Sequence, residues 1–340
     1  MLGHGIEDIY RLSPMQQGML FHEMAEPGSG LYLLHRVYEL DGPFQVDAFI
    51  DAWRRAMERH PVLRTSFHWK EVDQPVQVVH ASVDLPVERE DWSTLGAEER
   101  RERARAFDQR QQRPFDLEGA PLMRIGLVRL GEERYRFTWT FHHALMEGWS
   151  AAIVMDEVLR DYAATVDGQQ PQLEERRPFR DYLTWVGSQD LDQAESYWRN
   201  ALEGIESPST LLGEARLPTN DDTGGGWDHR EFETRLSKET TAALRELGRA
   251  SGVTLNTTVQ AAWALLLSRF TDSERVLFGS TVSGRSADLQ GVEEIVGLFI
   301  NTIPTALRLD ADQRVGDWLE EVQKSQVRAR SFEWCSLVDI

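Results

Sequence analysis

Two adjacent histidines, His142 and His143, are the residues of this sequence best suited to chemistry. They follow a run of alternating aromatic residues and precede Glu147 and Gly148. Imidazole exchanges protons near physiological pH, so one ring could act as a general base or proton carrier. If strand alternation continues, the two rings face opposite sides. One ring could then serve a reaction while its neighbour supports the loop. The alternative is a histidine pair that only satisfies hydrogen bonds within the fold.

Other chemistries find less support in the sequence. His143 and Glu147 stand four residues apart, but zinc or iron needs a third protein ligand and His142 would point away, so we expect no metal site. Residues 279–286 nearly match a phosphate-binding loop, yet Arg285 stands where that motif has lysine. Neither a nucleophile elbow, nor a dinucleotide fingerprint, nor a paired-cysteine motif occurs.

A strand before the histidines and a helix after them must position the pair. Aromatic residues alternate with polar ones over 134–141, which predicts a half-buried strand joined through 131–133 to a strand over 122–130. Apolar residues at helical spacing predict an amphipathic helix over 150–163 with Ser150 as its N-cap. Further expectations are helices over 43–58, 237–249, 255–270 and 314–330, a strand over 275–283 and a connector over 203–230.

Composition excludes several classes of protein. The 340 residues include 37 lysines and arginines against 56 aspartates and glutamates, a formal net charge of −19 at pH 7. Such an acidic chain is a poor partner for nucleic acid or an anionic membrane, and no apolar run is long enough to span a bilayer. Cys335 is the only cysteine, so a reducing cytoplasm is the simplest location. The length fits two domains.

Residues 142–148 (HHALMEG) resemble the His-His-x-x-x-Asp-Gly motif of condensation domains from nonribosomal peptide synthetases. Further stretches resemble other motifs of this family and occur in the family's order. They are residues 12–22 (LSPMQQGMLFH), 59–67 (RHPVLRTSF), 179–185 (FRDYLTW), 296–302 (VGLFINT) and 331–337 (SFEWCSL). The resemblance covers essentially the whole chain, and the ordered combination of motifs is highly specific.

The resemblance implies a mixed α/β fold of two lobes, each similar to chloramphenicol acetyltransferase, arranged as a V-shaped pseudo-dimer. Residues 1–175 would form the N-terminal lobe with the histidine motif, and residues 176–340 would form the C-terminal lobe. Because the sequence stops soon after the sixth motif, we expect this second lobe to be truncated at its end. A lobe that lacks strands would expose an apolar sheet edge.

The resemblance also implies an activity and its partners. Donor and acceptor peptidyl carrier proteins would each present a thioester on a phosphopantetheine arm, and the acceptor amine would attack the donor thioester in antibiotic or siderophore biosynthesis. The domain itself would bind no cofactor, and adenylation and epimerisation domains would adjoin it. Aminolysis of a thioester is downhill, so the protein's task is mainly to hold two substrates in line.

Site residues follow from the same motifs. His143 would be the catalytic group, as a base or as an orienting group, with His142 and Gly148 beside it. Glu147 stands where the family has aspartate, which pairs structurally with an arginine that Arg285 resembles. Ser150 and Asn301 are further residues expected to line the site.

Glu147 is the departure from the family that bears on activity. Its additional methylene would displace the histidine loop, and a displaced catalytic group loses rate, so Glu147→Asp is expected to raise turnover. The alternatives left open are a weakened site, a non-catalytic module that recruits a partner, and, more distantly, a free-standing acyltransferase that uses coenzyme A. Residues 12–22, 253–256 and 282–285 most resemble the branch that joins a D-configured donor to an L-configured acceptor.

Overall fold

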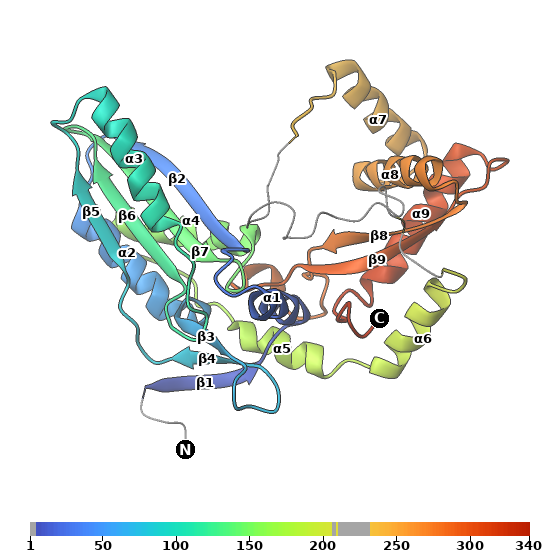
Figure 1. Cartoon of the computed structure of the whole chain (residues 1–340), viewed down its shortest axis with the longest axis horizontal. Helices are drawn as coiled ribbons and strands as arrows, with labels where there is room; N and C mark the ends of the chain where they lie inside the picture. Colours follow the sequence, from blue (N-terminus) through green and yellow to red (C-terminus); the bar gives the residue numbers. More distant parts are fainter. Residues whose placement is uncertain (1–4, 206–208, 210–231) are drawn as a thin grey trace. The chain divides into compact units, whose positions relative to one another are not determined.

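The computed structural model describes residues 5–205, 209 and 232–340. Helices and strands are both present throughout this part of the chain, as predicted for a mixed α/β fold (Figure 1). The chain divides into two compact units, each with its own core. The first unit runs to Gln189 and includes Ala287–Ile300, and the second comprises Asp190–Ser286 and Asn301–Ile340.

The first unit therefore contains more of the chain than the expected lobe of residues 1–175. Helix α5 (Phe179–Gly187) belongs to it because Phe179 and Tyr182 pack against Phe299 in a common apolar cluster. The segment 287–300 belongs to it for the same reason, although it is far away in sequence. The predicted lobe boundaries remain a proposal.

A four-stranded sheet forms the centre of the first unit. Its strand order is β2 (Leu33–Asp41), β7 (Arg134–His142), β6 (Met123–Arg129) and β5 (Val87–Asp91). Strands β6 and β7 are antiparallel neighbours, which confirms the predicted hairpin, and β5 runs parallel to β6. The long strand β2 pairs with β7 along its whole length up to His142.

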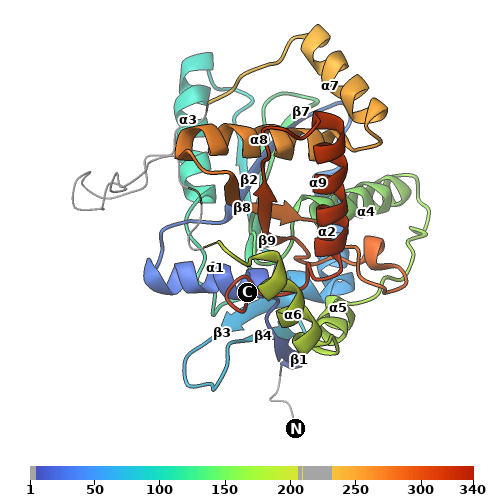
Figure 2. The ribbon, with the colours of Figure 1, turned by 90° about the vertical axis from the view of Figure 1, so that its right-hand side faces the viewer.

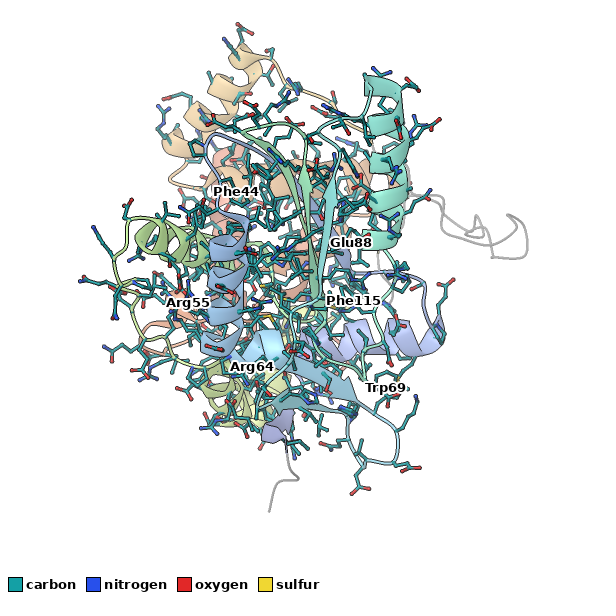
Figure 3. The ribbon with its side chains drawn as sticks, turned by 90° about the vertical axis from the view of Figure 1, so that its left-hand side faces the viewer. Phe44, Arg55, Arg64, Trp69, Glu88 and Phe115 are labelled. Carbon is teal, nitrogen blue, oxygen red and sulfur yellow. The ribbon has the colours of Figure 1, made fainter. Side chains whose placement is uncertain are left out.

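The alternating aromatic residues of β7 place one face of this sheet against helices. Phe137 and Trp139 contact Phe49 and Trp53 of α2 (Val46–Arg59), and all four side chains are buried. Helix α4 (Gly148–Val166) packs beside α2. Aromatic side chains bury large apolar areas, so this layer supplies much of the core. Figure 3 shows α2 with Arg55 labelled on it.

The opposite face of the sheet is covered by α3 (Ala97–Gln111). Phe107 of α3 is fully buried and lies over Gly126 of β6, where a β-carbon would come within 2.4 Å of the ring. Trp92 packs edge-on against the same ring, at 5.7 Å between centroids. Figure 3 places Glu88 of β5 beside this helix. Glycine at position 126 therefore allows α3 to approach the sheet.

A smaller sheet with the order β1 (Ile6–Arg11), β4 (Val76–His80) and β3 (Thr65–His68) completes the first unit. Helix α1 (Pro14–Ala25) follows β1 and opens with a capping box of Ser13 and Gln16. The short 3-10 helices η1 (Pro61–Arg64) and η3 (Val292–Glu294) also belong here. Buried Arg64 binds the carbonyl of Met57 and pairs with Glu7.

The second unit contains an antiparallel pair, β8 (Arg275–Val282) and β9 (Asn301–Arg308), with helices around it. These helices are α6 (Leu191–Ala201), α7 (Lys238–Ala250), α8 (Leu255–Thr271) and α9 (Val315–Arg330). Apolar residues of α8 and α9 pack on the two strands (Figure 2). The predicted elements at 237–249, 255–270, 275–283 and 314–330 are confirmed. Most of the connector predicted over 203–230 lies outside the described residues.

No helix in the described part of the chain combines the length and apolar character needed to cross a bilayer.

Gly126→Ala is expected to lower the free energy of unfolding by about 1–3 kcal/mol, because the new methyl group forces buried Phe107 away from the sheet. Thermal or urea unfolding measures the change. Gly131→Ala is the matched control on the same hairpin, since the nearest atom to its β-carbon is the Cβ of Arg134 at 3.8 Å. Equal stability of the two variants would contradict the proposed role of Gly126 in the α3 contact.

Candidate active site

The histidines lie where β7 passes into α4. The strand ends at His142, so His143 already belongs to a turn and the predicted alternation of faces stops one residue short of it. Helix α4 begins at Gly148, and its N-cap is Glu147, whose carboxylate accepts the N–H of Ser150 at 3.3 Å. The prediction of Ser150 as N-cap is therefore wrong. A carboxylate at this position also interacts favourably with the positive end of the helix dipole.

His142 supports the turn. Its ring is buried, and Nδ1 accepts the N–H of Ala144 at 3.1 Å. Burial and repulsion by His143 lower the pKa of His142 to about 4, although a hydrogen bond with the backbone of Leu31 acts in the opposite direction. His142 is therefore uncharged at neutral pH and does not act as a general acid there.

His143 is the more accessible of the two histidines. Its side chain is partly exposed, and its backbone N–H donates to the carbonyl of Tyr32 at 2.7 Å. Its carbonyl accepts the N–H of Met146 at 3.2 Å, so the main chain is fixed on both sides of the residue. The Nδ1 atom is buried and has no hydrogen-bond partner among the described residues. The imidazole of His143 is thus held by its backbone, without a side-chain acceptor at Nδ1 in this part of the chain.

Glu147 joins the turn to a distant segment of the same unit. Its side chain is buried, and the carboxylate oxygen that accepts Ser150 N–H lies 3.1 Å from the Ser150 hydroxyl oxygen. The other oxygen accepts the backbone N–H of Phe299 at 3.3 Å. Phe299 is itself buried against Phe179 and Tyr182. The glutamate side chain therefore bridges the helix terminus and the segment 287–300.

Ser150 and Asn301 both make structural contacts. Ser150 is fully buried, and its hydroxyl donates to the carbonyl of Gly297 at 2.8 Å and accepts the N–H of Gly297 at 3.1 Å. Asn301 is buried in the second unit, where its amide donates to the carbonyls of Glu333 at 2.8 Å and Cys335 at 2.6 Å. Each of the two side chains secures neighbouring backbone, so their expected role in lining the site remains a proposal.

Gly148 and Arg285 differ in exposure and lie in different units. Gly148 is exposed at the first position of α4 and has no positive φ, so the turn does not require glycine for its backbone angles. A β-carbon there would meet only Arg36 Nη2, at 3.9 Å, which leaves room for close approach of a ligand. Arg285 is buried in the second unit, just after β8. Its expected pairing with Glu147 stays a proposal.

The structure adds two residues that the sequence analysis did not single out. The Nε2 of Gln16 donates to the carbonyl of Ala144 at 2.9 Å, and Tyr32 supplies the carbonyl that binds His143. Gln16 could have been found, because it lies in the first motif and in a Ser-x-x-Gln capping box. Tyr32 has a positive φ, which cannot be predicted from the presence of a tyrosine in the sequence.

The described residues contain no group of three histidine, cysteine, aspartate or glutamate side chains placed to hold a metal ion.

Comparison with known proteins identifies the family. The family model for the Condensation domain matches residues 6–338. One of the linear gramicidin synthase proteins of Brevibacillus parabrevis is 40% identical over 337 residues, which are 98% of this chain and 4% of that protein. Surfactin synthase subunit 3 of Bacillus subtilis (strain 168) is 32% identical over 98% of this chain and 26% of its own length. The chain thus spans a minor part of these relatives.

Solved structures agree on the fold. A four-domain nonribosomal peptide synthetase bound to AMP and glycine has a TM-score of 0.75 at 20% identity, covering 99% of this chain and 25% of that one. The first condensation domain of the calcium-dependent antibiotic synthetase has a TM-score of 0.71 at 19% identity, covering 96% of this chain and 76% of that one. The chain therefore belongs to the condensation domain family, the amide-forming acyltransferase domains of nonribosomal peptide synthetases.

Proposed function

We propose that this chain forms a peptide bond between two thioester-bound substrates carried on the phosphopantetheine arms of separate carrier proteins. The observation that carries the proposal is the histidine turn, in which the His143 side chain is partly exposed while its backbone N–H and carbonyl are hydrogen-bonded. The relatives named above are far longer than this chain, which supports carrier and adenylation domains as its partners. A cytoplasmic location belongs to the same proposal.

In the proposed reaction the acceptor's amine nitrogen attacks the donor's thioester carbonyl. A carbon–nitrogen bond forms, and the carbon–sulfur bond breaks as the tetrahedral intermediate collapses. The nitrogen loses one proton and the departing sulfur gains one, so the reaction needs no oxidant or other co-reactant. The acceptor arm then holds the lengthened chain. Holding the amine and the carbonyl in line supplies most of the required acceleration.

We assign to His143 the role of contacting the acceptor's amine. In hydrolases that use histidine as a full base, a carboxylate accepts from Nδ1 and stabilises the imidazolium ion. Among the described residues no acceptor contacts Nδ1 of His143. This favours a role in which the imidazole accepts a hydrogen bond from the attacking amine and orients it, with at most partial proton transfer.

The finer parts of the proposal concern stereochemistry and the neighbouring domain. The resemblance of residues 12–22, 253–256 and 282–285 to one branch of the family supports a D-configured donor and an L-configured acceptor. A D donor would in turn come from an epimerisation domain upstream. Phosphopantetheine would arrive on the carrier proteins, so the domain itself would hold no cofactor.

His143→Ala is expected to lower the single-turnover rate of amide formation about a hundredfold, because the amine loses its orienting group. The assay uses one carrier protein loaded with a D or L donor, a second loaded with an L acceptor, and mass spectrometry of both carriers. We expect product from the D donor with the unaltered protein. Absence of product from either donor, with both carriers bound, would refute condensation; product from the L donor alone would refute the stereochemical assignment.

Glu147→Gln is expected to lower the same rate about tenfold or more, because the amide cannot accept hydrogen bonds from Ser150 and Phe299 at both ends. For Glu147→Asp the geometry favours an outcome opposite to the one expected from the sequence. A side chain shorter by one methylene group keeps the helix cap but does not span to Phe299, so we expect its rate to be no higher than that of the unaltered protein. A faster Glu147→Asp variant would instead identify a site weakened by glutamate.

Protonation of His142 is expected to destabilise the protein at low pH. Burial lowers its pKa from 6.5 to about 4, so the unfolded chain binds a proton between these values that the folded protein does not. The contribution of His142 to the free energy of unfolding is full above pH 6.5 and decreases by up to about 3 kcal/mol as the pH falls to 4. In His142→Asn the decrease should be smaller by that amount; identical pH profiles would contradict the assignment.

A further inference from the structure

Besides Glu147, helix α1 and the residues that precede β2 also form hydrogen bonds with the histidine turn. Three backbone groups of the turn are hydrogen-bonded. They are the N–H of His143, the carbonyl of Ala144 and the N–H of Met146. The first two are bound by groups outside the turn, namely Tyr32 and Gln16. One contact is at the N–H of His143 and the other is at the carbonyl of Ala144, the next residue. Together they fix the direction in which the His143 side chain leaves the main chain.

Tyr32 adopts a backbone conformation that is uncommon for its type. Its φ is +64°, in the left-handed region that bulky residues rarely enter. In this conformation its carbonyl accepts the N–H of His143 at 2.7 Å, while its ring lies edge-on to His142 at 6.4 Å between centroids. The Tyr32 hydroxyl bonds Nδ1 of His22, and the two rings are nearly parallel. Backbone strain of this kind persists only where surrounding contacts enforce it.

Gln16 supplies the second anchor from within α1. It is 1% exposed, and its Oε1 accepts the N–H of Ser13 at 2.8 Å as part of the capping box. Its Nε2 donates to the carbonyl of Ala144 at 2.9 Å. Gln77 donates to the same Oε1 at 2.9 Å, which fixes which end of the Gln16 amide faces the turn. A buried amide with both ends engaged has one favourable orientation.

We infer that Tyr32 and Gln16 are positioning residues for the reaction at His143, an inference that rests on the condensation activity proposed above. Neither side chain needs to touch substrate. Tyr32 holds the backbone of His143 through its carbonyl, and Gln16 holds the next peptide through its amide. A catalytic group displaced by about 1 Å can lose on the order of a hundredfold in rate, so small shifts of this turn matter.

Two substitutions at Tyr32 separate its backbone from its ring. Valine is β-branched and does not tolerate a positive φ, so Tyr32→Val moves the carbonyl, whereas asparagine adopts this conformation readily and Tyr32→Asn removes only the ring. We expect the single-turnover rate to fall on the order of a hundredfold for valine and less than about tenfold for asparagine. Gln16→Glu, which keeps the capping acceptor and loses the donor to Ala144, should lower the rate about tenfold.

Two quantities are measured in the full-length protein. One is the maximal rate, and the other is the concentration of acceptor-loaded carrier that gives half of that rate. Positioning predicts a lower maximal rate at an unchanged half-saturating concentration. Tyr38→Val is the matched control, because it removes a tyrosine ring that stacks on Phe137 from within β2, six residues after Tyr32 and away from the turn. It should lower the melting temperature and keep the rate within about twofold.

The outcomes separate this inference from the proposed function. If His143→Ala loses activity while Tyr32→Val and Gln16→Glu both keep rates within about twofold of the unaltered protein, the positioning role is refuted and condensation stands. Equal rate losses in Tyr38→Val and Tyr32→Val, following equal losses of stability, would also refute it. If His143→Ala keeps the full rate, the proposed function fails first and the positioning role fails with it.

Discussion

The carboxylate of Glu147 is the interaction on which the geometry of the histidine turn depends. It ends the turn, caps helix α4 at Ser150 and accepts the N–H of Phe299 from a segment about 150 residues away in sequence. A buried carboxylate is costly unless its oxygens are hydrogen-bonded, and in this turn both are. The helix terminus, the histidine turn and residues 287–300 are therefore connected through one carboxylate.

The remaining contacts of the turn fit this constraint. His142 is kept uncharged by burial and uses its ring to hold Ala144, so it stabilises the turn. His143 is secured through its backbone on both sides, and its side chain is partly exposed. This division of work suits a reaction whose main requirement is alignment of two large substrates, because an orienting group has to be fixed more than it has to be strongly basic.

The sequence predicted local elements well and long-range contacts poorly. The hairpin of β6 and β7 could be predicted because a two-residue alternation depends only on neighbouring residues. The start of α4 was misplaced because glutamate is not among the preferred N-cap residues, whereas Ser150 is of a preferred type but buried one turn later. The assignment of residues 287–300 to the first unit depends on packing with Phe179 and Tyr182, which no local pattern reveals. The left-handed backbone of Tyr32 is equally hidden in the sequence.

We propose that Glu147 contributes to amide formation by holding His143 in place. A double-mutant cycle of His143→Ala and Glu147→Gln, measured as single-turnover amide formation between two loaded carrier proteins, tests it most directly. If Glu147 acts through His143, the double variant is no slower than His143→Ala alone, because the positioned group is already gone. If the two rate losses multiply instead, Glu147 acts independently of His143, which contradicts its role in holding that residue.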